Sequence, residues 1–76
     1  MSVTEMNTTN GFLVHIFPIQ IILNKYATFV AMIFRPDGLH RANFLLEGDD
    51  YNNWGNDDNY IRNYICSKET YLGSPV

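Results

Sequence analysis

Apolar and polar positions divide the chain into a part typical of a sheet, residues 12–46, and a part typical of a helix that begins near residue 56. Residues 12–23 and 26–35 are mostly β-branched or aromatic, which favours two strands. Pro18 cannot donate a hydrogen bond to a neighbouring strand, so the first strand should lie at an edge or carry a bulge there. Asn24 and Lys25 form a candidate tight turn between the two strands.

A second turn is indicated by Arg35-Pro36-Asp37-Gly38-Leu39, which is typical of a β-hairpin. If glycine closes a bulge in the left-handed conformation, Phe34 pairs near His40 and Val30 pairs near Phe44. One face of the sheet would then carry Val30, Met32, Phe34, His40, Ala42, Phe44 and Leu46. The opposite face would carry Phe29, Ala31, Ile33, Arg41, Asn43 and Leu45.

The last part of the chain predicts one helix. Its apolar residues at helical spacing are Ile61, Tyr64, Ile65 and Leu72. Its candidate N-caps are Asn56, Asp57 and Asp58, whose side chains also suit the positive end of a helix dipole. Gly73 and Pro75 would end it. Lys68 falls within the apolar stripe, so either the helix ends before it or its stem covers apolar surface.

These elements predict an α+β fold, a three-stranded antiparallel sheet followed by one C-terminal helix, in the order β-β-β-α. Residues 1–10 are polar and lack periodicity, which predicts a flexible N-terminal arm. Residues 11–76 would form a single small domain.

The predicted sheet has apolar residues on both faces, yet one helix can cover only one of them. Phe29, Ile33, Leu45 and Ile22 would be left exposed in one patch, which monomeric proteins rarely carry. We therefore expect a second packing layer, supplied by a symmetry mate or by a partner protein. The alternative is that the N-terminal arm, or a sheet of different curvature, covers the patch.

Composition narrows the possible functions. The chain of 76 residues has a net charge of −3, and its five Lys and Arg residues do not cluster, which argues against direct binding of nucleic acid. One cysteine and two separated histidines argue against a disulfide and a structural zinc site. The apolar stretch 12–23 is too short to span a bilayer, so we expect no membrane association and an intracellular protein.

The acidic segment 47–58 suggests a calcium loop only at first sight. Compared with an EF-hand loop that starts at Asp50, the fifth and twelfth positions are Trp54 and Ile61, which offer no ligand oxygen. The adjacent carboxylates in this segment are expected to be solvated rather than tuned for catalysis. Cys66 falls roughly opposite the apolar stripe of the helix, so we expect a surface or interface residue. We predict no metal, no cofactor and no enzymatic activity.

Trp54 lies among tyrosines and carboxylates, and two interpretations of it stay open. It could close the core where the third strand leads into the helix, or it could belong to a partner-binding surface, where tryptophan and tyrosine are enriched. On the second interpretation, the candidate partner-binding residues of the segment are Asp49, Asp50, Tyr51, Trp54, Asp57, Asp58 and Tyr60. The sheet patch adds Phe29, Ile33 and Leu45.

The residues Tyr51-x-x-Trp54-Gly55-x-Asp57-Asp58, ahead of a C-terminal helix, resemble a segment of short accessory proteins encoded by tailed bacteriophages. The resemblance covers less than half of the chain and implies a viral origin rather than a particular activity. We expect a small non-enzymatic interaction protein of phage type, an inhibitor that occludes the surface of a host factor in the host cytoplasm. The alternative is a structural subunit of a virion or another homo-oligomeric assembly.

Overall fold

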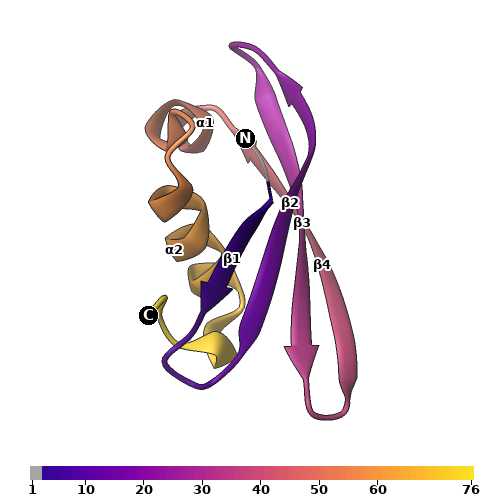
Figure 1. Cartoon of the computed structure of the whole chain (residues 1–76). Coiled ribbons are helices and arrows are strands. Elements are labelled where there is room, and N and C mark those ends of the chain that lie inside the picture. The colour runs from indigo at the N-terminus through magenta and orange to yellow at the C-terminus, as the bar shows by residue number, and fades with distance from the viewer. Residues whose placement is uncertain (1–2) are drawn as a thin grey trace.

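The structure is a computed structural model that describes residues 3–76 as a four-stranded antiparallel sheet with helices on one face (Figure 1). The strands are β1 (Thr4–Asn7), β2 (Leu13–Ile22), β3 (Tyr26–Arg35) and β4 (Gly38–Glu47), and they lie in the sheet in chain order. Two α-helices, α1 (Asp49–Trp54) and α2 (Asp58–Lys68), and a 3-10 turn, η1 (Thr70–Leu72), follow. The predicted α+β class is confirmed, but the fold has one more strand and one more helix than expected.

The additional strand, β1, lies in the segment that was predicted to be a flexible arm. Thr4 and Met6 are buried and pair with Ile16 and Val14 of β2. The prediction was wrong because one of the two buried residues of this short strand, Thr4, is polar, so the sequence shows no alternation of apolar and polar residues. Residues 1–2, which were part of the predicted arm, lie outside the described residues.

The prediction for Pro18 is confirmed, since the pairing of β2 with β3 shifts between Pro18 and Gln20. The extra residue of this bulge is Ile19, whose side chain is exposed. The turn after β2 also follows the prediction, because Asn24 adopts a positive φ of 62°. The backbone N–H of Asn24 donates to the Tyr51 hydroxyl at 3.0 Å, which ties this turn to α1.

The predicted hairpin between β3 and β4 is present, but its register is one residue away from the expected one. Arg35 pairs with Gly38 across a two-residue loop, so that Ile33 lies opposite His40 and Phe29 opposite Phe44. Because side chains alternate along a strand, a shift of one residue in one strand changes which residues of the two strands share a face. The expectation of a bulge closed by Gly38 was therefore wrong.

The core lies between the sheet and the helices. In β3 it takes Ala27, Phe29, Ala31 and Ile33, each no more than 1% exposed. Trp54 of α1 packs edge-on against Phe29, with 5.3 Å between the ring centroids. The other large buried side chains are Val14, Ile16, Leu46, Ile61, Ile65 and Leu72.

The acidic segment holds a short helix rather than a loop. Gly48 and Gly55, both with positive φ, flank α1. Asp57 caps α2, as one of the three candidates predicted, by accepting a 2.9 Å hydrogen bond from the backbone N–H of Asn59. The helix ends at Lys68, whose ammonium lies 5.4 Å from the centroid of the Tyr64 ring.

Cys66 is buried, contrary to the prediction of a surface position. Its Sγ atom lies 3.9 Å from the Sδ atom of Met6, so β1 covers the side of α2 that was expected to be exposed. The outer side of β1 is in turn paired near its end, because the Val76 N–H donates to the Asn7 carbonyl at 2.8 Å. At the opposite edge of the sheet, no described strand pairs with the outer side of β4.

Candidate interaction surface

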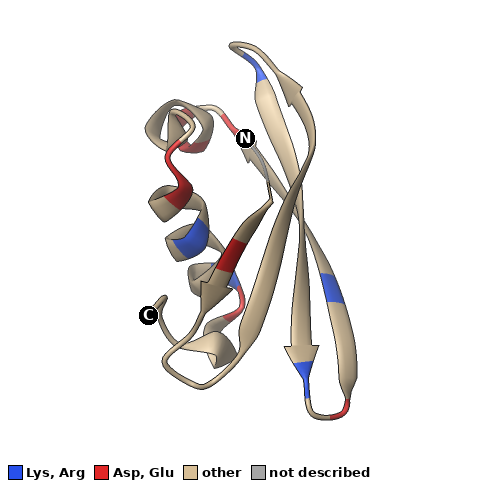
Figure 2. Ribbon diagram, viewed as in Figure 1, with Lys and Arg blue, Asp and Glu red and all other residues tan. Residues whose placement is uncertain are grey.

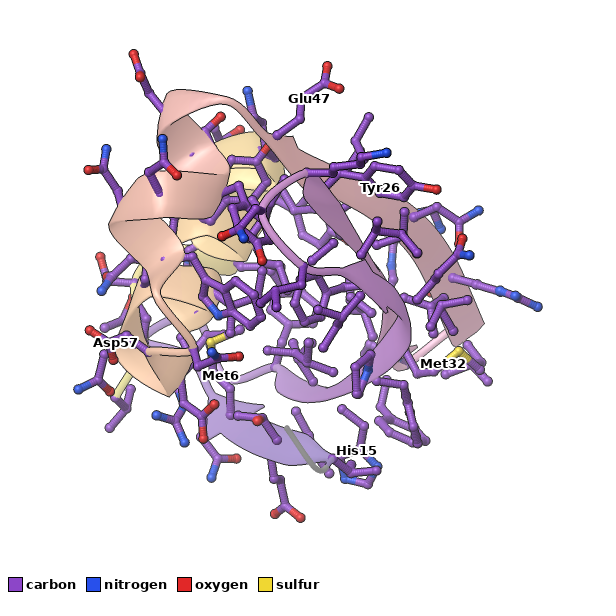
Figure 3. The ribbon with its side chains drawn as sticks, turned by 90° about the horizontal axis from the view of Figure 1, so that it is seen from above. Met6, His15, Tyr26, Met32, Glu47 and Asp57 are labelled. Atoms are coloured by element: carbon purple, nitrogen blue, oxygen red, sulfur yellow. The ribbon has the colours of Figure 1, made fainter. Side chains whose placement is uncertain are left out.

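The sheet face that points away from the helices is the candidate site, and we call it the open face. Figure 3 shows Met6 directed between sheet and helices, whereas His15 and Met32 point to the other side. In the described part of the chain, both helices lie on the side of Met6, and none covers the open face (Figure 1). The open face carries Glu5, Asn7, Leu13, His15, Phe17, Ile19, Gln20, Ile22, Tyr26, Thr28, Val30, Met32, Phe34, Leu39, Arg41, Asn43, Leu45 and Glu47.

Polar side chains are mixed with apolar ones on this face, and several of the apolar ones are in contact with solvent. Ile19 is 61% exposed and Leu39 54%, while Phe34 and Leu45 are each 44% exposed. Val30 is buried by its neighbours on the same face, at 6% exposure. A contiguous exposed patch of this kind marks interaction sites on proteins.

Three aromatic rings form a cluster on the open face. The His15 ring meets Phe34 edge-on, with 5.1 Å between centroids, and lies 6.4 Å from Phe17. His15 also faces the edge of the sheet, where its Nε2 atom lies 3.4 Å from a carboxylate oxygen of Glu5. The cluster spans β2 and β3 and contributes three ring side chains to the open face.

Charged residues of the open face lie at its two edges. Glu5 is on β1, beside His15 of β2, and Arg41 is on β4, beside Met32 of β3. Glu47, at the end of β4, lies on the same face beside Tyr26. Figure 2 shows the acidic position on β1 and a basic position on β4 at opposite edges of the sheet. Arg41 belongs to the open face because its neighbour His40, paired with the buried Ile33, faces the helical layer.

On the covered side of the sheet, His40 contacts the segment after α2. Its Nε2 atom lies 3.7 Å from a carboxylate oxygen of Glu69. The preceding hairpin residue Arg35 also reaches this layer, with its guanidinium carbon 5.2 Å from the centroid of the Tyr71 ring. These contacts join the end of the β3–β4 hairpin to η1 and the residue before it. Because His40 faces this layer, its neighbours Leu39 and Arg41 face the other side of the sheet.

A groove of about 360 Å³ runs along the β4 side of the sheet. Its lining includes Ile19, Thr28, Arg41, Asn43 and Leu45. Ile19, the extra residue of the bulge between Pro18 and Gln20, lines the groove together with Thr28 of β3. The lining combines apolar side chains with a few groups able to form hydrogen bonds, as protein-binding surfaces do.

The acidic residues predicted for partner binding lie elsewhere, on the helical layer. Asp49 and Asp50 are in the first turn of α1, and Asp57 and Asp58 begin α2 (Figure 2). Asp50 accepts a 2.9 Å hydrogen bond from the Tyr60 hydroxyl, and this bond raises the pKa of Tyr60. The structure thus brings Asp50 and Tyr60 into contact, and it places all four carboxylates on the helical layer rather than on the open face.

Trp54 belongs to the core, at 1% exposure, so the first of its two interpretations is the one that the structure adopts. Its Nε1 atom is buried and has no hydrogen-bond partner among the described residues. Tyr51 is half-buried beside Trp54, with 5.9 Å between the ring centroids. Neither ring is presented to a partner as the binding hypothesis required.

The three sheet residues predicted for partner binding are separated by the observed register. Phe29 and Ile33 are in the core, and only Leu45 lies on the open face. The residues that the prediction missed on this face are Leu13, Phe17, Val30, Met32, Phe34 and Leu39. The hairpin sequence contained no signal for these residues, because Pro36-Asp37-Gly38 fits a two-residue loop as well as a bulged turn.

Within residues 3–76, no group of three or more His, Cys, Asp or Glu side chains could hold a metal ion. No helix in that range has both the length and the apolar character needed to cross a membrane. Comparison of the chain with protein-family models, with curated proteins and with solved structures found no match.

Proposed function

We propose that this chain is a non-enzymatic interaction module that binds another protein chain through the open face. The observation that supports the proposal is an apolar sheet face with no layer over it in the described part of the chain. Domains are built from packed layers, and a sheet that is apolar on both sides needs one layer on each side. Here the helices supply one layer, and a partner would supply the other.

The energy available to such binding is substantial. Complete burial of an apolar side chain is worth about 1.5–3 kcal/mol, and Ile19, Phe34, Leu39 and Leu45 are each roughly half exposed. Their burial would therefore contribute on the order of 3–6 kcal/mol before the costs of association. We therefore expect the chain to bind a partner protein of complementary shape with moderate affinity.

The resemblance of residues 47–61 to phage accessory proteins supports a more specific version of the proposal. In that version the chain acts in the cytoplasm of the host cell as an inhibitor that occludes the surface of a host factor. The acidic residues of α1 and α2 stay available on the opposite side of the molecule, where their charge would attract a basic partner. In this version the chain would inhibit the host factor by covering its surface, and the inhibition would use no metal or cofactor.

The second candidate function is that of a structural subunit in a virion or another symmetric assembly. The observation that favours it is the placement of Glu5 and Arg41 at opposite edges of the open face. A surface on which one row has opposite charges at its two ends can pair with a copy of itself along that row.

The test of the proposed function uses two variants that each replace an exposed apolar residue by glutamate. Phe34→Glu alters the open face, and Leu23→Glu alters the turn after β2, where Leu23 is 77% exposed. Each protein is immobilised, exposed to a lysate of a candidate host, and the retained proteins are identified and purified. We expect at least one retained host protein, or the free wild-type chain, to distinguish the immobilised proteins. It should bind immobilised wild type and Leu23→Glu at least tenfold more tightly than immobilised Phe34→Glu.

The proposal is overturned if the purified binders and the free wild-type chain all bind the three proteins equally. The circular dichroism spectrum and melting temperature of each variant show whether the fold is retained. If Phe34→Glu does not fold, Leu45→Glu replaces it, because Leu45 is also 44% exposed on the same face.

A further inference from the structure

We propose that the partner on the open face is a second copy of this chain, and that Glu5 of each copy faces Arg41 of the other. The two sheets would stack face to face as a sandwich, with the helices on the outside. This inference rests on the proposed binding through the open face, in its second version as a symmetric assembly, and goes further because it gives the arrangement of the two copies. It is carried by the order of charged and apolar residues across the strands.

One row across the sheet contains both charges. Glu5 of β1 pairs with His15 of β2, and His15 pairs with Met32 of β3. Met32 pairs in turn with Arg41 of β4. The row therefore runs from an acidic residue at one edge to a basic residue at the other, at the same height along the strands (Figure 2).

A two-fold axis parallel to the strands, between β2 and β3, exchanges the two edges of the sheet and keeps the height along the strands. It places Glu5 of one copy opposite Arg41 of the second copy, and symmetry repeats the pair at the other edge. Stacked sheets of this kind keep their strand directions within about 30° of each other. An axis across the strands would instead stack β1 on β1, which has no basic residue among Thr4–Asn7.

The same rotation matches the apolar residues. Leu13 and Phe34 are neighbours in one row, and each would face the other residue in the second copy. Phe17 and Val30 are neighbours in another row and would be exchanged in the same way. The result is an apolar centre with an ion pair at each rim, which is the usual anatomy of a protein interface.

The area of the open face sets the expected affinity. Three strands of ten residues and one of four, at about 3.3 Å per residue and about 4.8 Å between strands, cover on the order of 500 Å² in each copy. Two copies would bury on the order of 1,000 Å², near the lower limit for a specific interface. We therefore expect a dimer with a dissociation constant in the micromolar range.

The test measures self-association of the full chain by sedimentation equilibrium from about 1 to about 500 µM. The wild type is compared with Glu5→Arg, with Arg41→Glu, and with an equimolar mixture of the two variants. Each single variant puts like charges together at both rims of its homodimer. We expect its dissociation constant to rise on the order of tenfold, because each of two pairs changes from attraction to repulsion.

The mixture is the decisive sample. In a heterodimer of the two variants, the arginine introduced at position 5 of one chain faces the glutamate introduced at position 41 of the other. The second rim keeps the original residues, with Arg41 of the first chain facing Glu5 of the second, so both rims are attractive again. We expect the mixture to regain wild-type association within about threefold. A change that acted only through the fold of either variant would not be restored by mixing.

Two results overturn the inference. One is a wild-type chain that stays monomeric up to about 500 µM. The other is a dimer that neither charge variant weakens, or whose loss is not restored on mixing, because that dimer forms through another surface. A monomeric wild type that still binds a purified host protein through Phe34 overturns only the second copy as partner, whereas loss of both bindings also overturns the proposed function.

Discussion

At the scale of single residues, the structure assigns roles that sequence spacing could not. Cys66 was expected on the surface because it lies roughly opposite the apolar stripe of α2. It is buried because Met6 of β1 packs against it, and β1 comes from a segment with little apolar character. The burial of Cys66 depends on contact between two segments that are far apart in the sequence. The helical pattern of residues 58–68 alone therefore cannot predict it.

The burial of Cys66 leads to the first residue-scale prediction. Burial raises the pKa of the Cys66 thiol, so the folded protein holds the thiol in its neutral form at pH values where an unfolded chain begins to ionise. We expect slow reaction with a thiol reagent at about pH 8 and fast reaction in denaturant, followed by absorbance. Equal rates in the two states would contradict this account.

The same shift in pKa has a consequence for stability. An unfolded thiol loses its proton near about pH 8.5, whereas the folded thiol loses it only at higher pH. The contribution of Cys66 to the free energy of unfolding is therefore complete below about pH 8.5 and is lost as the pH rises through the folded pKa. A Cys66→Ala variant is the control, because it should not show this part of the pH dependence.

At the scale of secondary-structure elements, local signals were reliable where a single residue type has a strong conformational preference. Pro18 marked a bulge, Asn24 a turn with positive φ, and Asp57 the start of a helix. The register of the hairpin was not predictable in the same way, because a two-residue loop and a bulged turn both fit Pro36-Asp37-Gly38. β3 has apolar residues on both sides and so did not favour either register.

The capping of α2 gives a prediction at this scale. Asp57→Ala removes the acceptor of the 2.9 Å hydrogen bond from Asn59, and we expect it to lower the free energy of unfolding by about 1 kcal/mol. Asp58→Ala is the matched control, because it removes a carboxylate from the same turn and leaves the capping bond. Urea unfolding measures both variants, and an equal loss in the two would assign the effect to charge rather than to the cap.

At the scale of the whole molecule, the sequence predicted that one apolar face of the sheet has no cover, but not which residues of β3 lie on that face. A sheet with two apolar faces and too few helices to cover both was predicted, and the structure has this property. The two sides of β3 were exchanged relative to β4, because the one-residue error in register placed Phe29 and Ile33 outside and Met32 and Phe34 inside. The charged row across the open face could not be predicted at all, since Glu5 lies on a strand that the sequence did not indicate.

The two-copy arrangement predicts how stability depends on concentration. When only the folded form associates, mass action stabilises it, so the melting temperature of the wild type should rise with protein concentration. The melting temperature of Phe34→Glu should stay constant over the same range. Scanning calorimetry at several concentrations measures both, and a constant wild-type value would contradict association of the folded chain.

The unpaired outer side of β4 has a further consequence, for aggregation. An exposed edge strand offers its backbone groups to any other strand, and proteins commonly protect such an edge with a charged side chain. In β4 this protection falls to Arg41, the basic residue in the middle of the strand. We therefore expect replacement of Arg41 by a neutral residue to make growth along this edge easier, and to remove the charge at the rim of the open face as well.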